Sequence, residues 1–139
     1  TDPLFSEGGI NYVYLNESHK EAAIEMLTEV FVEAEPFGMM CGIKKEGFRG
    51  LHSIPWKYQC ENGISVAAID EATGKLCGVF TAEDKYPKMG CCEGMSLNNK
   101  YISLVMEHQE FETMFTLVDE LNVPMVEEHA AIKKKYKTG

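Results

Sequence analysis

The spacing of apolar residues predicts a strand and then a helix near the start of the chain. Tyr12 to Leu15 alternates in character and is rich in residues that favour strands. Further on, apolar residues recur at intervals of three and four, which places them on one face of a helix: Ile24, Leu27 and Phe31. We therefore expect a strand followed directly by an amphipathic helix.

Both ends of this helix carry sequence signals. Ser18 and Glu21 have the spacing of a capping box, in which each side chain bonds a backbone N–H at the helix start. At the other end, Pro36 disfavours helical backbone at Glu35, the residue before it. The helix is therefore expected to end near Glu33, with the carboxylate of Glu35 just beyond it.

The middle of the chain changes pattern twice. Residues 37–63 combine glycines and prolines with isolated apolar residues, which predicts a partly helical excursion instead of a regular strand. Two β-prone runs follow, Ile64 to Ile69 and Leu76 to Ala82. They are separated by the turn residues Asp70 to Lys75, which include Gly74. This arrangement predicts a β-hairpin.

The last part of the chain is expected to be helical. Lys85 to Asn99 is interpreted as a connector because of its glycines and paired asparagines. A long amphipathic helix should follow, with helical spacing at Leu104, His108, Phe111, Phe115 and Val118. Pro124 favours the first turn of another helix that runs to about Lys135. The pattern predicts one α+β domain over residues 1–139, with a strand, helices and an antiparallel hairpin, and two helices after them.

Charge and hydropathy narrow the class of partner. The 139 residues carry a formal net charge of -9, whereas binding of nucleic acid or an anionic membrane needs a basic surface. No apolar run approaches the length of a membrane span, and no signal-peptide pattern opens the chain. We therefore expect a cytoplasmic protein with no nucleic-acid or membrane partner. A small amine substrate, which carries positive charge at neutral pH, is compatible with the net negative charge of the chain. The need for solubility alone also explains this charge.

The five cysteines show neither a disulfide nor a clear metal-binding spacing. Their number is odd and no Cys-x-x-Cys pair occurs, so a disulfide framework is not expected. Cys91 and Cys92 with His108 or His129 offer zinc-ligand chemistry, but adjacent cysteines rarely reach one ion without a strained turn. We therefore expect reduced thiols and no metal site.

Glu35 and His52 are the candidates for acid–base chemistry. Glu35 lies among apolar neighbours at the expected helix end, where a partly desolvated carboxylate suits a general base. His52 lies in the central excursion near Trp56, and an imidazole there suits a proton shuttle. The alternatives are a solvated loop acid for Glu35 and a packed or surface histidine for His52.

A group of apolar and aromatic residues around these two forms the candidate substrate contacts. Its members are Phe37, Met39, Met40 and Trp56, with His52 beside them. Methionine and aromatic side chains adapt to irregular ligands, so this group is suited to line a pocket for an aryl or alkyl amine. The same residue types also fill cores, and the pattern alone leaves both interpretations open.

Together these segments resemble the N-terminal half of the GNAT superfamily of N-acetyltransferases, and within it the arylalkylamine (dopamine-type) branch. The resemblance is carried by Phe31 and Glu35-Pro36 at the helix end. It is also carried by the hairpin GISVAAIDEATGKLCGVFTAED, with its turn Asp70 to Gly74 and the pair Gly78-Val79. It covers most of the chain and implies a GNAT-like α/β fold, in which the strand and the hairpin of this chain form half of a mixed sheet and the chain forms the acceptor side.

The resemblance implies transfer of an acetyl group from acetyl-CoA to a small amine substrate, with Glu35 as the general base. The family binds the pyrophosphate of acetyl-CoA with a glycine-rich loop at a helix N-terminus, and no such loop occurs in this sequence. The cofactor-binding residues therefore stay unknown. In the family, the strand that carries the loop would begin about where this sequence ends, at Lys137 to Gly139.

Two functions are therefore compatible with the sequence. The first is an N-acetyltransferase to which this chain contributes the acceptor side. The second is a non-catalytic interaction module or a degenerate GNAT-like subunit, which the missing loop favours. In either case the strand Leu76 to Ala82 would present an open edge. Such an edge is expected to pair with a complementary C-terminal half or with a second copy of the chain.

Overall fold

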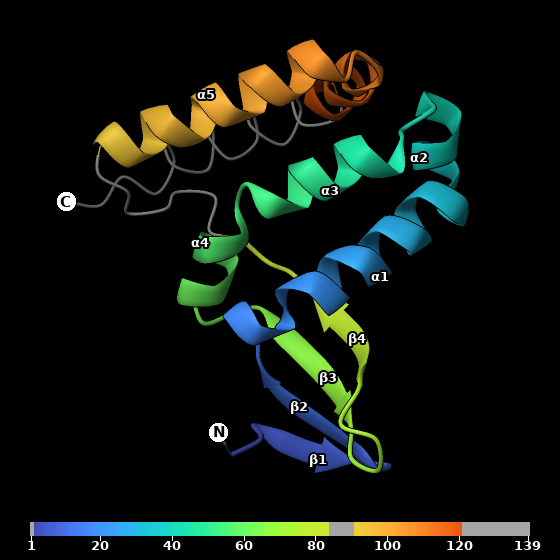
Figure 1. Ribbon diagram of the computed structural model, residues 1–139, viewed down its shortest axis with the longest axis vertical. Helices are drawn as coiled ribbons and strands as arrows, with labels where there is room; N and C mark the ends of the chain where they lie inside the picture. The colour runs from blue at the N-terminus through green and yellow to red at the C-terminus, as the bar shows by residue number, and fades with distance from the viewer. Residues whose placement is uncertain (1, 84–90, 121–139) are drawn as a thin grey trace, which may run out of the picture.

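The computed structural model describes residues 2–83 and 91–120, without the side chains of residues 91–93. This part of the chain forms a four-stranded antiparallel sheet in the order β1-β2-β3-β4 (Figure 1). The strands are β1 (Phe5–Glu7), β2 (Ile10–Tyr14), β3 (Val66–Asp70) and β4 (Leu76–Phe80). The predicted α+β class, strand and hairpin are therefore confirmed, and every strand pair in the described sheet is antiparallel.

The helix after β2 begins with a different cap from the one expected. A 3-10 turn, η1 (Glu17–His19), runs directly into α1 (Lys20–Glu33). Asn16 Oδ1 accepts the Ser18 N–H at 3.0 Å, and His19 Nδ1 accepts the Asn16 N–H at 3.2 Å. The predicted pair of Ser18 and Glu21 is wrong, because the capping box is formed by Asn16 and His19, and the Asn16 side chain already occupies the Ser18 N–H. The predicted end of α1 at Glu33 is confirmed.

The central excursion is helical over most of its length. It contains α2 (Pro36–Cys41), α3 (Lys45–Ser53) and α4 (Trp56–Glu61). Pro36 occupies the first turn of α2, where its missing N–H costs no hydrogen bond. Gly42 ends α2 with a positive φ of 69°, a conformation that glycine adopts without strain.

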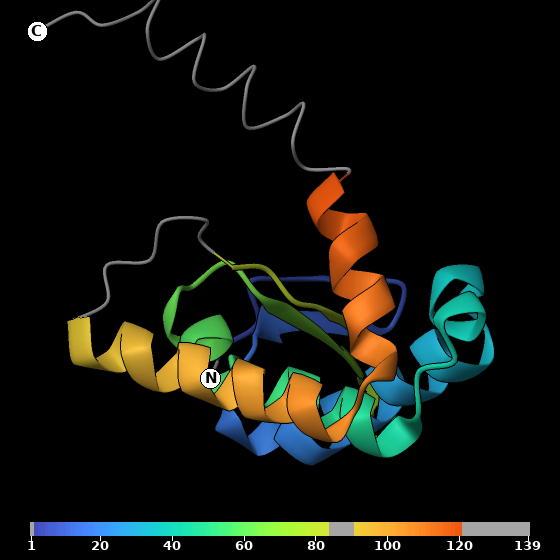
Figure 2. The same ribbon diagram turned by 90° about the horizontal axis from the view of Figure 1, so that it is seen from above.

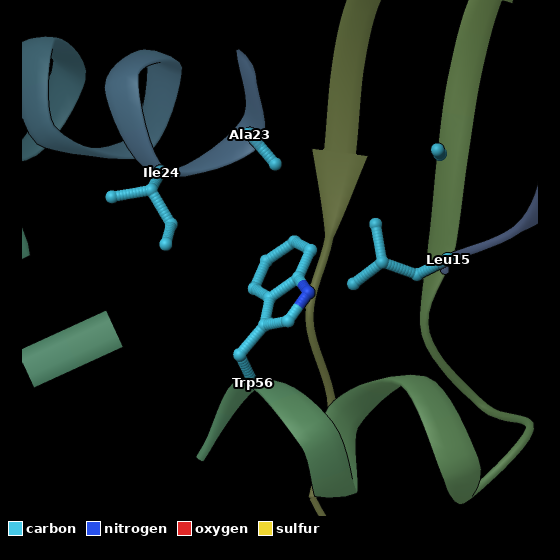
Figure 3. Packing of buried hydrophobic residues seen from close by; sticks show 5 residues of the cluster. Leu15, Ala23, Ile24 and Trp56 are labelled. Carbon is cyan, nitrogen blue, oxygen red and sulfur yellow. The ribbon is translucent and has the colours of Figure 1, made fainter. Parts of the chain in front are cut away.

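A first hydrophobic core lies between the sheet, α1 and α4. Figure 3 shows the indole of Trp56 between α1 and the strands, beside Ala23, Ile24 and Leu15. Trp56 is only 1% exposed and Leu15 only 2%. Burial of these large side chains holds α1 and α4 against the sheet.

A second hydrophobic core joins α1 and α3 to the C-terminal helices. Its buried members are Ile43, Phe48, Leu104, Phe111 and Met114. In Figure 1, α3 lies between α1 and α5 (Cys91–Glu107). Two glycines of α3 allow this approach, because a Cβ at Gly47 would lie 2.8 Å from Phe111 Cε2 and one at Gly50 would lie 2.7 Å from Leu104 Cδ1.

Residues 91–120 hold two helices after the hairpin, which agrees with the predicted fold class, but both lie within the segments predicted as a connector and a single long helix. α5 begins at Cys91, inside the predicted connector, and the expected long helix is interrupted after Glu107. A second helix covers residues 110–120, and Figure 2 shows it turning sharply away from α5. Residues of both helices, Leu104 of α5 and Phe111 of the second helix, pack against α3. The helix predicted from Pro124 lies outside the described residues.

Candidate functional site

Glu35 lies at the junction of α1 and α2 and is held in place by the backbone. Its own backbone is extended, with φ -86° and ψ 120°, as the following proline requires. The half-buried side chain turns back, and Oε2 accepts the Gly38 N–H at 2.6 Å. Glu35 is therefore the N-cap of α2, and its carboxylate has a fixed position instead of the freedom of a loop acid.

The first turn of α2 is pressed against the end of α1. Gly38 is buried, and a Cβ there would lie 2.5 Å from the Phe31 carbonyl oxygen and 2.7 Å from two atoms of its ring. The Phe31 ring in turn stacks on Phe48 of α3, with ring centroids 4.3 Å apart. The position of Glu35 therefore depends on the packing of α1, α2 and α3.

The predicted substrate contacts occupy different environments. Met39 and Met40, on the same short helix that Glu35 caps, are 57% and 70% exposed. Phe37 is half-buried and packs at the edge of the second core. Trp56 is a core residue, 1% exposed, so for this side chain the structure supports the core interpretation that the sequence had left open. Met39 and Met40 are thus the exposed members of the group.

His52 lines a separate cavity of about 660 Å³. The cavity is bounded by residues of α3, α4, α5 and the helix 110–120, together with Glu83. His52 packs against Phe48, its Nδ1 has no hydrogen-bond partner among the described residues, and burial lowers its pKa. Glu35 is not among the residues that line this cavity, so the structure does not bring the two acid–base candidates into one site.

The same cavity contains polar residues that the sequence analysis did not single out. Gln59, only 3% exposed, donates from Nε2 to Glu83 Oε1 at 2.7 Å. Tyr101 also lines the cavity, and burial together with the negative charge of Glu83 raises its pKa to about 12. Gln59 belongs to α4, Glu83 to the segment that follows β4, and Tyr101 to α5. No local spacing in the sequence therefore links these three residues.

The described thiols are separate from one another and form no metal site. Cys41 and Cys60 are half-buried, Cys77 is exposed, and all three are free. Within residues 2–83 and 91–120, no cluster of three or more His, Cys, Asp or Glu side chains is placed to bind a metal ion. The zinc set considered from the sequence involves the side chains of Cys91 and Cys92 and residue His129, which lie outside the description. None of the helices described is long and apolar enough to cross a membrane.

The second hairpin strand, β4, is the outer strand of the described sheet. It bonds β3 on one side, and the sheet order places no other described strand beside it. Phe80 at its end is 65% exposed and Cys77 is also exposed. This geometry is that of an edge strand with apolar surface.

Comparisons of the chain with models of known protein families, with curated proteins and with solved structures find no match.

Proposed function

We propose that this chain is the acceptor-side portion of an N-acetyltransferase that transfers an acetyl group from acetyl-CoA to a small amine. The observation that carries the proposal is the carboxylate of Glu35, held at the end of α1 by the Gly38 N–H beside the exposed Met39 and Met40. The order of elements agrees with the family resemblance, since β2, α1, the Glu-Pro pair and the β3–β4 hairpin follow one another around one sheet.

The proposed role of Glu35 is to take a proton from the acceptor amine. An amine that is protonated at neutral pH must lose a proton before its nitrogen lone pair can attack a carbonyl carbon. The Gly38 N–H engages Oε2, whereas Oε1 has no hydrogen bond among the described residues. Oε1 is therefore the oxygen available to accept the proton, directly or through one water molecule. Met39 and Met40 would contact the apolar part of the amine.

The residues of this chain do not fit the pyrophosphate of acetyl-CoA. Its binding needs backbone N–H groups at a helix N-terminus that follows a glycine-rich loop, and the sequence contains no such loop. The N-terminus of α2 is occupied by the Glu35 carboxylate, which would repel a phosphate. In this proposal the acyl donor is bound by a complementary C-terminal half, and the open edge of β4 is where that half adds its strand.

The edge of β4 also favours the second function, an interaction module without catalysis. An exposed edge strand with Phe80 at its end pairs with a partner strand whether or not the assembly is an enzyme. The two functions differ in whether the completed assembly binds acetyl-CoA.

Calorimetric titration with acetyl-CoA separates the two functions. We expect no binding to the chain of 139 residues alone, because the glycine-rich loop is missing. We expect binding once a C-terminal half with the loop is joined to it, and this half should also be titrated alone as a control. Absence of binding by the joined protein would leave the interaction module as the function.

A further inference from the structure

The cavity lined by His52 contains a buried hydrogen-bond acceptor, Gln59 Oε1, with no partner among the described residues. The Gln59 amide is oriented by its bond to Glu83, since only its nitrogen can donate to a carboxylate oxygen. Gln59 Oε1 therefore points elsewhere, and it is buried with no hydrogen-bond partner among the described residues. A buried acceptor without a donor is costly, so this oxygen indicates a donor that residues 2–83 and 91–120 do not supply.

The carboxylate of Glu83, which accepts the Gln59 amide N–H, forms no ion pair with a described cationic side chain. Glu83 lies exposed at the rim of the cavity. The neighbouring Tyr101 is half-buried, and the negative charge of Glu83 helps to keep its phenol protonated. Negative charge and an unsatisfied acceptor thus occur together at one end of the cavity.

Apart from His52 and Asn98, the rest of the wall is apolar. Ile102 and Met106 of α5 are 55% and 76% exposed at the cavity, and Phe115 and Val105 lie beside them. Exposed apolar side chains that border a hollow are typical of ligand-binding surfaces. The volume of about 660 Å³ is within the range of small-molecule sites.

We propose that this cavity is a binding site for a primary alkylammonium ion, with the ammonium group between Gln59 and Glu83 and the alkyl chain against Ile102 and Met106. An ammonium group has three N–H donors and no acceptor, which complements the Gln59 oxygen and the carboxylate. A bare metal ion suits the site less well, because no cluster of three or more His, Cys, Asp or Glu ligands occurs in the described part of the chain. The site is separate from Glu35 and does not depend on acetyl transfer.

The test uses the intact chain with n-hexylamine, which is protonated at neutral pH, and with hexan-1-ol as a neutral probe of similar size. Titrations are followed by NMR of the methyl groups of Ile102 and Met106. We expect saturable shifts of both methyl groups, and binding of the ammonium about fivefold tighter than that of the alcohol, the equivalent of about 1 kcal/mol. Hexyltrimethylammonium, which is charged but has no N–H donor, should bind more weakly than hexylammonium.

Two variants locate the charge that gives this preference. Glu83→Gln should bind the two probes equally, whereas Glu71→Gln, which changes an exposed acid of the hairpin turn outside the cavity, should keep the preference. Equal binding of hexylammonium and hexanol to the unaltered chain would overturn the proposal without recourse to any variant. Shifts confined to other methyl groups, or no saturable shift, would show that water alone occupies the site and would also overturn it.

Discussion

The close contact between α2 and α1 gives a quantitative prediction about the position of Glu35. Replacement of Gly38 by alanine would place a Cβ 2.5 Å from the Phe31 carbonyl oxygen and 2.7 Å from two ring atoms. The nearest atom belongs to the backbone, so a side-chain rotation cannot relieve the contact. Overpacking of this kind costs roughly 1–3 kcal/mol, and we expect the upper part of that range.

The helix propensity of alanine offsets part of this cost. Alanine is favoured over glycine in a helix by up to about 1 kcal/mol. Gly38→Ala should therefore lower the free energy of unfolding by about 1–2 kcal/mol net. Gly94→Ala is the matched control, because a Cβ at Gly94 of α5 would meet no atom within 4 Å. That variant should be about 0.5–1 kcal/mol more stable than the unaltered chain.

Gly50→Ala should fall between these two variants. Its Cβ would meet Leu104 Cδ1 at 2.7 Å, but that atom is the end of a side chain that can rotate. Urea unfolding followed by circular dichroism measures the free energy of unfolding of the three variants. The m-value, which is the slope of this free energy against urea concentration, should be the same for all three if they unfold in the same way. If Gly38→Ala proves as stable as Gly94→Ala, α2 does not pack on Phe31 and the described position of Glu35 is wrong.

Two further predictions concern the core and the cavity. Trp56→Ala should lower the free energy of unfolding by about 3–5 kcal/mol, because the indole is buried in the first core and only 1% exposed. A loss below about 1 kcal/mol, measured by urea unfolding, would contradict the buried position of Trp56. Burial lowers the pKa of His52 below the ordinary value of 6.5. The imidazole therefore binds a proton more tightly in the unfolded chain than in the folded one, and the free energy of unfolding should decrease as the pH falls below about 6.5. His52→Phe should reduce this pH dependence without abolishing it, because burial also lowers the pKa of His19. If the slope of the unfolding free energy against pH is unchanged in the variant, that result would contradict the burial of His52.

Local sequence signals predicted the β3–β4 hairpin and the end of α1 correctly. The hairpin follows from two β-prone runs and the turn at Gly74, whose positive φ of 67° suits glycine. The end of α1 follows from Pro36, which excludes helical backbone at Glu35. The position of Glu35 beyond α1 was therefore predictable, whereas its bond to the Gly38 N–H requires the turn of α2 that the sequence indicated only loosely.

Tertiary packing decided the features that the sequence did not reveal. The apolar residues from Leu104 to Phe115 have helical spacing, which predicts one continuous helix, yet the helix breaks after Glu107 and residues on both sides of the break pack in the second core. Glycines that looked like connector or loop signals, such as Gly47 and Gly50, instead permit close helix contacts. The pairing of Gln59 with Glu83 joins segments 24 residues apart, a distance over which no local pattern operates.

The catalytic role of Glu35 is tested most directly by the turnover of Glu35→Gln in a protein that joins this chain to its cofactor-binding half. Glutamine keeps a side-chain oxygen that can accept the Gly38 N–H, so α2 is retained, but this side chain cannot take a proton. We predict a loss of kcat/KM for the amine of at least about 100-fold with acetyl-CoA binding unchanged. Glu33→Gln, at the exposed end of α1, should keep turnover near that of the unaltered protein. Unchanged turnover of Glu35→Gln across the pH range would contradict the account.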